Sequence, residues 1–280
     1  MNEVRTVEVF TQHFEKYRSE IMKELAIANS CPEYSKDIII VVHDQLPYLK
    51  ACIESIQANT NNYHLYIWDN ASQPDTQEYL DTLMLKNPGT VDVMRSDENL
   101  GFIRPNNQLA SWGTGEYIIL LNSDTKVFEG WDKGLIGCLR NDPEIAQVGY
   151  LGGVLNEDGR GVGWGFGFKL DYVPGWCFCI SRETYSEFGL FNENDLSFAY
   201  CEDADFSLRL QEAGKKVYAL HLMLVHHYEN KTIKVVRDKG EIDVVKTFEQ
   251  NHEYMRRRWK DYLHTERVAG KEPKHELVDC

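Results

Sequence analysis

Apolar runs alternate with helically spaced apolar residues along the first half of the chain. The segments 37–42 and 117–121 are almost wholly apolar, which is typical of strands that are buried on both faces. Shorter runs predict strands at 64–68 and 91–94, and apolar spacings of three and four predict helices over 46–56, 76–85 and 105–112. This alternation predicts an α/β fold with a mostly parallel central sheet and helices on both faces.

Helical patterns flank this region at both ends of the chain. Apolar spacing predicts a helix over 4–28, which we expect to pack on the main domain, with a partner or membrane role as the alternative. Another helix is predicted over 241–268. We therefore expect an accessory helix at 1–34, a central α/β domain at 35–232 and a C-terminal helical extension at 233–280.

The second half of the chain has a more irregular pattern. Glycines crowd the segment 152–167, which has no Walker lysine and predicts a hairpin or loop. Helices are predicted at 183–188 and from about 203 to 213, where Gly214 would end the second helix, and a strand is predicted at 216–220. A second α/β portion is therefore expected after the glycine-rich segment.

Charge and cysteine content narrow the range of functions. The chain has 280 residues, with 30 basic and 44 acidic side chains and a formal charge of -14, which argues against general binding to nucleic acid. Its seven cysteines are scattered without zinc-binding spacing, so we expect reduced thiols in a cytoplasmic protein. No signal-peptide pattern follows Met1 and no apolar run reaches the length of a membrane span, so the protein is expected to be soluble.

A basic stretch in the C-terminal region leaves two interpretations open. The segment from Met255 to Lys260 reads Met-Arg-Arg-Arg-Trp-Lys and falls within a predicted helix. A solvated helix face is the simpler interpretation. The alternative is peripheral contact with an anionic membrane surface, which would suit a lipid-linked acceptor.

A carboxylate follows directly on the buried strand at 117–121. There the chain turns to Asn122, Ser123, Asp124 and Thr125. In sheets of this kind, ligands bind beyond the carboxyl ends of the strands, and Mg²⁺ or Mn²⁺ needs only one or two protein carboxylates when phosphate and water complete its shell. Asp124 is therefore a candidate metal ligand, and a simple turn-forming role remains the alternative.

Two further polar groups could take part in chemistry. Glu202, Asp203 and Asp205 crowd the start of a predicted helix, where they could be a solvated capping cluster or could supply a general base. His226 and His227 follow an apolar run, and imidazole is a common ligand of Mn²⁺. The histidines alone would remain unassigned.

The order of five segments resembles the family 2 glycosyltransferases of GT-A fold. These segments are "VVHDQLPYLKACIESI", "IWDNAS", "ENLGFIRPNNQLASWGTGEYIILLNSDTKV", the stretch from Gly175 to Leu220, and "LVHHYEN". The resemblance covers roughly residues 37–229 and is closest to the rhamnosyl- and galactofuranosyltransferase-like branch. It implies a GT-A fold with N- and C-terminal helical additions.

This resemblance implies a nucleotide site at the strand ends. By the family pattern, Asp69 of the Asp-Asn-Ala-Ser turn would contact the nucleotide base. The loop at His43 and Asp44 would line the same pocket, although it reads His-Asp-Gln-Leu where the family usually has Thr-Tyr-Asn. The other residues that the pattern places on the nucleotide-sugar are Asn99, Gly101, Asn107, Asn122 and Ser123.

The metal and catalytic roles are likewise implied by the resemblance. Asn122-Ser123-Asp124 matches the family's Asp-x-Asp motif, so Asp124 would bind Mn²⁺ or Mg²⁺ while Asn122 replaces the first carboxylate. The histidine after the last strand is similar to His226, a second metal ligand, and the neighbouring His227 leaves this assignment open by one residue.

The acceptor side is implied in the same way. The glutamate-aspartate pair of the family matches Glu202-Asp203, which makes Asp203 the general base and places Glu202 at the acceptor. Trp176 stands where the family usually has a small residue, and it could form a stacking platform for the sugar or could belong to the core.

Taken together, the resemblance implies an inverting transferase of the hexosyltransferase type. The enzyme would move a sugar from a nucleotide-diphosphate donor, foremost a UDP-sugar, to a hydroxyl of a saccharide or glycolipid acceptor, as in polysaccharide biosynthesis. A non-catalytic nucleotide- or sugar-binding protein of GT-A fold is the alternative, with Asn122 marking lost metal affinity. A nucleotidyltransferase is disfavoured because "VVHDQLPYLK" has neither glycine nor an early lysine to hold a triphosphate.

Overall fold

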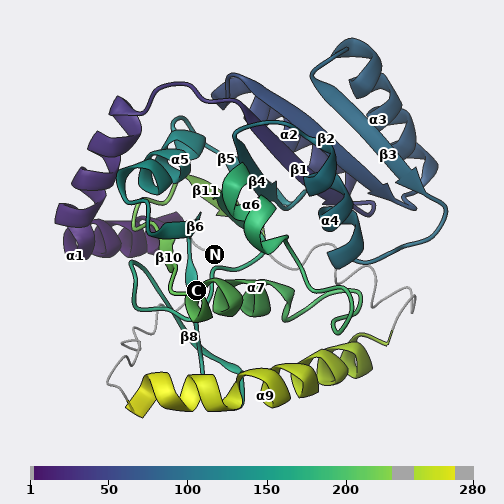
Figure 1. Ribbon diagram of the computed structural model, residues 1–280. Helices are drawn as coiled ribbons and strands as arrows, with labels where there is room; N and C mark the ends of the chain where they lie inside the picture. Colours follow the sequence, from purple (N-terminus) through teal and green to yellow (C-terminus); the bar gives the residue numbers. More distant parts are fainter. Residues whose placement is uncertain (1–2, 229–242, 269–280) are drawn as a thin grey trace.

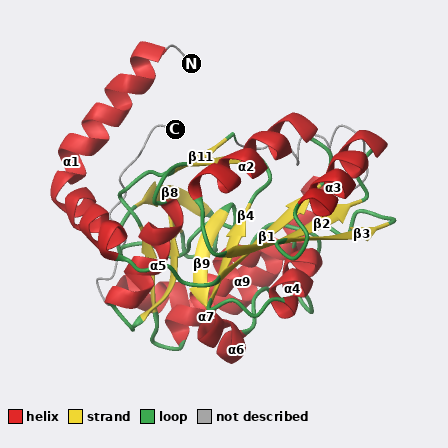
Figure 2. Ribbon diagram, turned by 90° about the horizontal axis from the view of Figure 1, so that it is seen from above, coloured by secondary structure: helices red, strands yellow, loops and turns green. Residues whose placement is uncertain are grey.

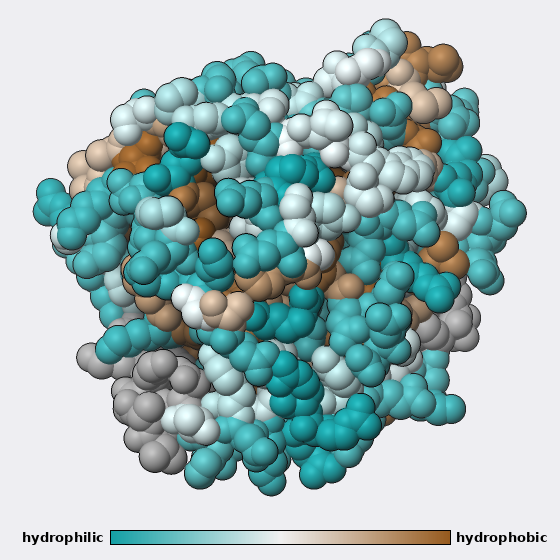
Figure 3. All heavy atoms as spheres, viewed as in Figure 1, coloured by the Kyte–Doolittle hydropathy of each residue, from teal (hydrophilic) through white to brown (hydrophobic). Residues whose placement is uncertain are grey.

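The computed structural model describes residues 3–228 and 243–268, with side chains for 11–228 and 243–265 (Figure 1). The expected boundary between residues 232 and 233 lies outside the described residues. Of the described helices, none is long and apolar enough to cross a membrane. The face in Figure 3 is mostly hydrophilic, and its hydrophobic groups are interrupted by polar residues.

A seven-stranded sheet with the order β10-β6-β9-β4-β1-β2-β3 forms the centre of the molecule. β1, β2, β3 and β4 run parallel, β10 is parallel to β6, and β9 is antiparallel to both of its neighbours, β4 and β6. The predicted mostly parallel sheet is thus confirmed. The strands span Lys36–Val42 (β1), Tyr63–Asn70 (β2), Val91–Ser96 (β3), Tyr117–Leu121 (β4), Ile145–Gly149 (β6), Cys177–Ser181 (β9) and Lys216–Ala219 (β10).

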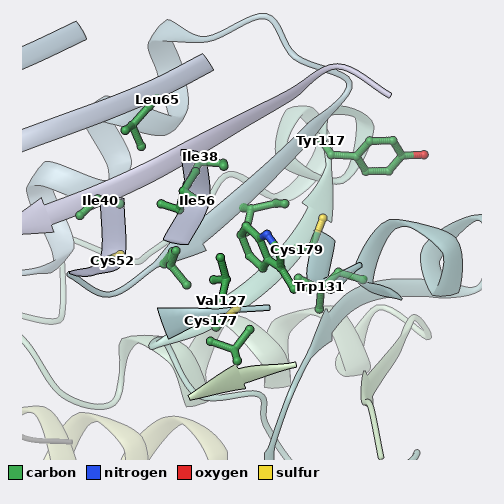
Figure 4. Close-up of a cluster of buried hydrophobic side chains, with 14 of the residues drawn as sticks. Ile38, Ile40, Cys52, Ile56, Leu65, Tyr117, Val127, Trp131, Cys177 and Cys179 are labelled. Atoms are coloured by element: carbon green, nitrogen blue, oxygen red, sulfur yellow. The ribbon is translucent and has the colours of Figure 1, made fainter. Parts of the chain in front are cut away.

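Helices cover both faces of this sheet, as Figure 2 shows. The helices are α2 (Leu46–Asn59), α3 (Pro74–Lys86), α4 (Ile103–Trp112), α5 (Trp131–Asn141), α6 (Arg182–Phe188) and α7 (Glu202–Glu212). Side chains of α2, α3 and α5 pack with Ile38 and Ile40 of β1, while those of α4 and α7 pack with Ile39 on the opposite face. Because successive strand residues point to opposite faces, an unbroken apolar run serves both layers. Figure 4 shows the cluster on one of these faces, which contains Ile38 and Ile40 of β1.

Two short sheets lie outside the central one. β5 (Thr125–Val127) follows β4 directly and pairs antiparallel with β11 (Val225–His227). β7 (Gly152–Leu155) and β8 (Gly161–Gly165) form an antiparallel hairpin, which confirms the hairpin predicted from the glycine-rich segment. At Gly153 a side chain has no room, because a Cβ there would meet the ring of Tyr172 at 2.1 Å.

The N-terminal helix α1 (Glu3–Ser30) packs mainly against α5. A buried carboxylate anchors it to the segment between β10 and β11. Glu24 is 4% exposed, and its oxygens accept hydrogen bonds from the Tyr218 hydroxyl and from the backbone N–H groups of His221 and Leu222. Several donors on one buried carboxylate satisfy the charge that burial would otherwise penalise.

The C-terminal helix α9 (Val244–Val268) lies alongside α7, beneath it in Figure 1. Met255, Trp259 and Leu263 pack with Leu155 and Leu208. Asp205 of α7 is fully buried, and it accepts hydrogen bonds from Tyr254 and Trp259 of α9. In the predicted basic stretch the apolar side chains are buried, while its arginines and Lys260 are exposed, which is the arrangement of a solvated helix face.

Candidate functional site

Polar residues gather where the parallel strands β1, β2 and β4 end. Val42 pairs with Asp69 at the ends of β1 and β2, and β4 runs in the same direction beside β1. The segments after these three strands begin at His43, Ala71 and Asn122, and Asp69 is the last residue but one of β2. All three strand ends therefore reach the same edge of the sheet. Ligands of open α/β sheets bind at such an edge.

Asp124 and His227 meet at this edge. Asp124 immediately precedes β5, and the antiparallel pairing of β5 with β11 sets His227 opposite Thr125. The Tyr228 N–H donates to the Asp124 carbonyl oxygen over 2.9 Å, and His227 Nε2 lies 3.1 Å from Asp124 Oδ1. Asp124 is only 3% exposed, so the pair is fixed by backbone pairing and burial.

His226, the histidine first matched to the metal ligand, lies at the neighbouring position of β11. It pairs with Lys126 and is exposed, and its ring contacts Tyr228 edge-on at 4.7 Å. Neighbouring strand residues point to opposite faces, so only one of the two histidines can face Asp124. His227 takes this place, which is the alternative that the sequence left open.

The spacing of the Asp124 and His227 atoms fits a shared divalent cation. Adjacent ligands at about 2.1 Å from an octahedral ion are about 3 Å apart, and the observed separation is 3.1 Å. The described residues contain no group of three or more His, Cys, Asp or Glu side chains that could hold a metal. A cation at this pair would therefore depend on phosphate oxygens and water for the rest of its ligands.

A three-residue segment, 174–176, links this pair to the second acidic site. The Trp176 ring is stacked on the His227 ring, with centroids 5.2 Å apart and planes 11° apart. The Trp176 carbonyl accepts a hydrogen bond from the Asn122 N–H over 2.8 Å, and the Gly175 N–H donates to Asp203 Oδ2 over 2.9 Å. Asp124, His227, Trp176 and Asp203 thus belong to one connected site.

Asp203 and Glu202 differ in exposure at the start of α7. Asp203 is half-buried, and burial raises the pKa of its carboxyl although the N–H groups of Gly175 and Ala204 oppose the shift. Burial raises the pKa of Glu202 well above its usual value, and the charge of Asp203 adds to the effect. Glu202 Oε2 is buried with no hydrogen-bond partner among the described residues. A carboxylate with a raised pKa that keeps solvent access suits a general base, which favours Asp203.

Asp69 is fully buried, and both of its carboxylate oxygens are engaged by the protein. Oδ1 accepts from the Ser72 N–H over 3.0 Å, and Oδ2 accepts from Arg95 Nε over 2.6 Å. The Arg95 side chain is 34% exposed and lies opposite Asp69 in the β2–β3 register. The sequence analysis did not single out Arg95. A basic residue at a strand end beside the polar turn was the pattern that could have indicated it.

His43 and Asp44 brace the loop after β1 against the turn after β2. His43 Nδ1 lies 2.7 Å from the Asn70 carbonyl oxygen, and Asp44 Oδ1 accepts from the Gln73 N–H over 2.7 Å. Asp44 has φ of 59°, a left-handed conformation that is costly for a residue other than glycine and recurs at functional sites. Both residues lie at the strand-end edge, where they were expected.

Asn99, Gly101 and Asn107 make contacts within the protein. Asn70 donates to Asn99 Oδ1 and to the Gly101 carbonyl, which fixes this segment to the end of β2. Asn107 exchanges two hydrogen bonds with the Phe191 backbone, and with Arg104 and Glu193 it lines a cavity of about 410 Å³. These contacts fix the three residues within the protein.

The chain is similar in sequence to known proteins. A family model described as "Glycosyl transferase family 2" matches residues 37–180. The chain is 28% identical over 261 residues to the "Uncharacterized protein y4gI" of Sinorhizobium fredii, covering 80% of this chain and 27% of that protein. It is 23% identical over 218 residues to N-acetylgalactosaminyltransferase 7 of Drosophila melanogaster, covering 64% of this chain and 37% of that protein. The chain therefore spans less than half the length of either relative.

A solved structure is similar over nearly the whole chain. The crystal structure of GalNAc-T7 with UDP, GalNAc and Mn²⁺ superimposes with a TM-score of 0.62 at 15% sequence identity. The similarity covers 92% of this chain and 67% of that chain. At this level of identity the similarity establishes the fold.

The electrostatics of Glu202 lead to a pH-dependent prediction. Because the folded-state pKa of Glu202 is raised, its stability contribution is present at low pH and is lost as pH rises through that pKa. The glutamine of Glu202→Gln cannot ionise, so the variant should be more stable than wild type at pH 8. Its free energy of unfolding there should be greater by at least about 1 kcal/mol. The two proteins should converge as pH falls towards 4.5. Urea unfolding across this range measures the difference, and Glu183→Gln, an exposed site, should track wild type throughout. A variant less stable than wild type at pH 8 would contradict the prediction.

Proposed function

The chain belongs to glycosyl transferase family 2, and on this premise we propose that it transfers a sugar from a nucleotide-diphosphate donor to an acceptor hydroxyl with inversion. Its fold is GT-A, as the similarity to the GalNAc-T7 structure establishes. Glycosyl transfer from a nucleotide-sugar is the activity that the family supports. We further propose inversion, a bound metal, a hydroxyl acceptor and membership of the rhamnosyl- and galactofuranosyltransferase-like branch.

One observation carries this proposal: the Asp124–His227 pair and a carboxylate with a raised pKa are joined through residues 174–176. Trp176 stacks on His227, and its neighbour Gly175 donates to Asp203. An inverting transferase needs a donor held on one side of the reacting carbon and a base on the other. The short connection supports a site in which both groups act on one sugar.

For the donor side, we assign Asp124 and His227 to a divalent cation, Mn²⁺ or Mg²⁺. When bound, such a cation neutralises negative charge on a departing diphosphate. Asn122 and Ser123 adjoin the pair and would contact the donor. Asp69 would act on the base through Arg95, because the protein already occupies both of its oxygens. A UDP-sugar remains the first choice, since GalNAc-T7 was crystallised with UDP.

For the acceptor side, we assign Asp203 as the general base. Its carboxylate would accept the proton of the attacking hydroxyl, and the Gly175 N–H would hold Oδ2 in place. A raised pKa strengthens a carboxylate as a base at neutral pH. Trp176 lies between the two halves and would orient His227 through the ring stack, with its indole also available to the sugar. The acceptor would be a saccharide or glycolipid hydroxyl.

The two adjacent histidines provide a matched test of the metal assignment. His227→Ala removes the imidazole that would bind the cation together with Asp124. The variant should bind UDP in Mn²⁺ at least about tenfold more weakly than wild type. His226→Ala removes an exposed neighbour and should change the affinity by less than about threefold. Calorimetric titration of UDP in Mn²⁺ measures both. Stronger loss in the His226 variant would restore the original assignment and contradict this one.

The function itself is tested by Asp203→Asn. The variant keeps the shape of the side chain but cannot accept the proton, so transfer should fall about 10²–10⁴-fold while donor binding stays close to that of wild type. Turnover is measured as nucleotide release from a panel of nucleotide-sugars in the presence of saccharide acceptors. Near wild-type turnover in the variant would overturn the base assignment. A folded wild type that turns over no nucleotide-sugar would favour the non-catalytic alternative.

A further inference from the structure

The loop at residues 197–201 has an unusual backbone. It leads directly into α7, and Phe198, Tyr200 and Cys201 have φ of 61°, 78° and 70°. Left-handed conformations are costly for residues with a side chain, and three within four residues persist only when surrounding contacts enforce them. The next two residues along the chain are Glu202 and Asp203. The backbone conformation of this loop therefore determines where the first turn of α7 is placed.

A single side chain of α9 holds this loop. Asn251 is 1% exposed, and its Nδ2 donates to the carbonyl oxygens of Ser197, Ala199 and Tyr200 over 2.8, 2.9 and 3.0 Å. Its Oδ1 accepts from the Ser197 N–H over 3.0 Å. One side-chain amide thus binds the backbone N–H and carbonyl of Ser197 and two further backbone carbonyls, which the left-handed backbone turns towards it.

The start of α4 holds the same loop from another side. The Phe198 carbonyl accepts from the N–H groups of Phe102 and Ile103 over 2.6 and 3.2 Å. Gly101 is required here, since a Cβ would come within 2.5 Å of that carbonyl oxygen. The Phe102 ring in turn lies close to Gly175, the residue that donates to Asp203. The loop is therefore fixed between α4 and α9.

We infer that Asn251 is a positioning residue for Asp203. By enforcing the left-handed loop, Asn251 holds the first turn of α7 where Asp203 Oδ2 meets the Gly175 N–H. The inference rests on the proposed function and extends it, because Asn251 lies outside residues 37–180 that match the family model. The helix α9 then completes the proton-accepting side of the site.

A purely structural role in docking α9 is the competing explanation. Other contacts already dock α9 on α7, namely the bonds of Tyr254 and Trp259 to Asp205 and the apolar cluster around Met255. The bonds of Asn251 that the structure records go to the loop alone. The two explanations differ in what the loss of Asn251 changes. Positioning affects turnover, whereas docking affects stability.

The test uses two variants of Asn251 and one control on the same helix. Asn251→Ala removes every bond to the loop, and Asn251→Asp keeps the size and the acceptor oxygen but loses the donor. Arg258→Ala breaks an exposed ion pair between α9 and Glu212 at the far end of α7. For each protein we would measure kcat, the affinity for UDP with Mn²⁺, and amide hydrogen exchange over residues 197–203.

Both Asn251 variants should lose about 10–100-fold in kcat, as expected when a catalytic group is displaced by about 1 Å. Their UDP affinity should stay within about threefold of wild type, and exchange over 197–203 should speed up while that of β1 and β4 does not change. Arg258→Ala should lower the melting temperature slightly and keep kcat within about twofold.

Two results would overturn the inference alone: a folded Asn251 variant with wild-type kcat, or parallel losses of kcat and UDP affinity. If Asn251→Ala does not fold, the isosteric aspartate variant decides by the same criteria. A wild-type protein that neither binds UDP nor transfers a sugar would instead contradict the proposed function, and the inference would fall with it. Hydrogen exchange would then still report whether Asn251 holds the loop.

Discussion

The antiparallel pairing of β11 with β5 is the contact on which the site depends. It brings His227 to Asp124 across about a hundred residues of chain and decides which of two adjacent histidines faces the carboxylate. β4 belongs to the buried central sheet, and only Asn122, Ser123 and Asp124 separate it from β5. The buried strand β4 therefore fixes the position of Asp124. Trp176 stacks on His227, and its neighbour Gly175 donates a hydrogen bond to Asp203, so Asp203 is connected to the same strand pair. A rigid sheet thus fixes groups that come from four separate parts of the chain.

The acidic start of α7 contains carboxylates in three different environments. Three carboxylates lie within four residues, and the structure uses each differently. Asp205 is buried and satisfied by Tyr254, Trp259 and Arg209, so it joins α7 to α9. Glu202 is buried with an oxygen that lacks a partner among the described residues, which is costly. Asp203 is only partly buried and accepts a hydrogen bond from the Gly175 N–H. A strained loop and an unsatisfied carboxylate next to a half-buried one are features that selection retains at working sites.

Elements that depend on a local apolar pattern could be predicted from the sequence. Residue positions that depend on strand pairing or on distant contacts could not. β1 and β4 were predictable because burial on both faces requires an unbroken apolar run. β6, β9 and α5 were not predicted, since their segments are short or carry glycines, and only the sheet around them makes them regular. Asp124 was placed correctly at the sheet edge from its strand, but the choice of His227 depends on a register with β5 that no local signal encodes. The same holds for Arg95 and Asn251, whose roles come from distant partners, Asp69 and the loop at 197–201.

The proposed donor site is the edge formed by Asp69, Asp124 and His227, which would bind a nucleoside diphosphate through a metal. Calorimetric titration of the wild-type protein with UDP, dTDP and GDP, each in Mn²⁺ and again in excess EDTA, is the experiment to do first. One of the three nucleotides should bind in Mn²⁺, and EDTA should abolish the binding. If none of the three binds, or if EDTA leaves the binding unchanged, the proposed donor site is wrong.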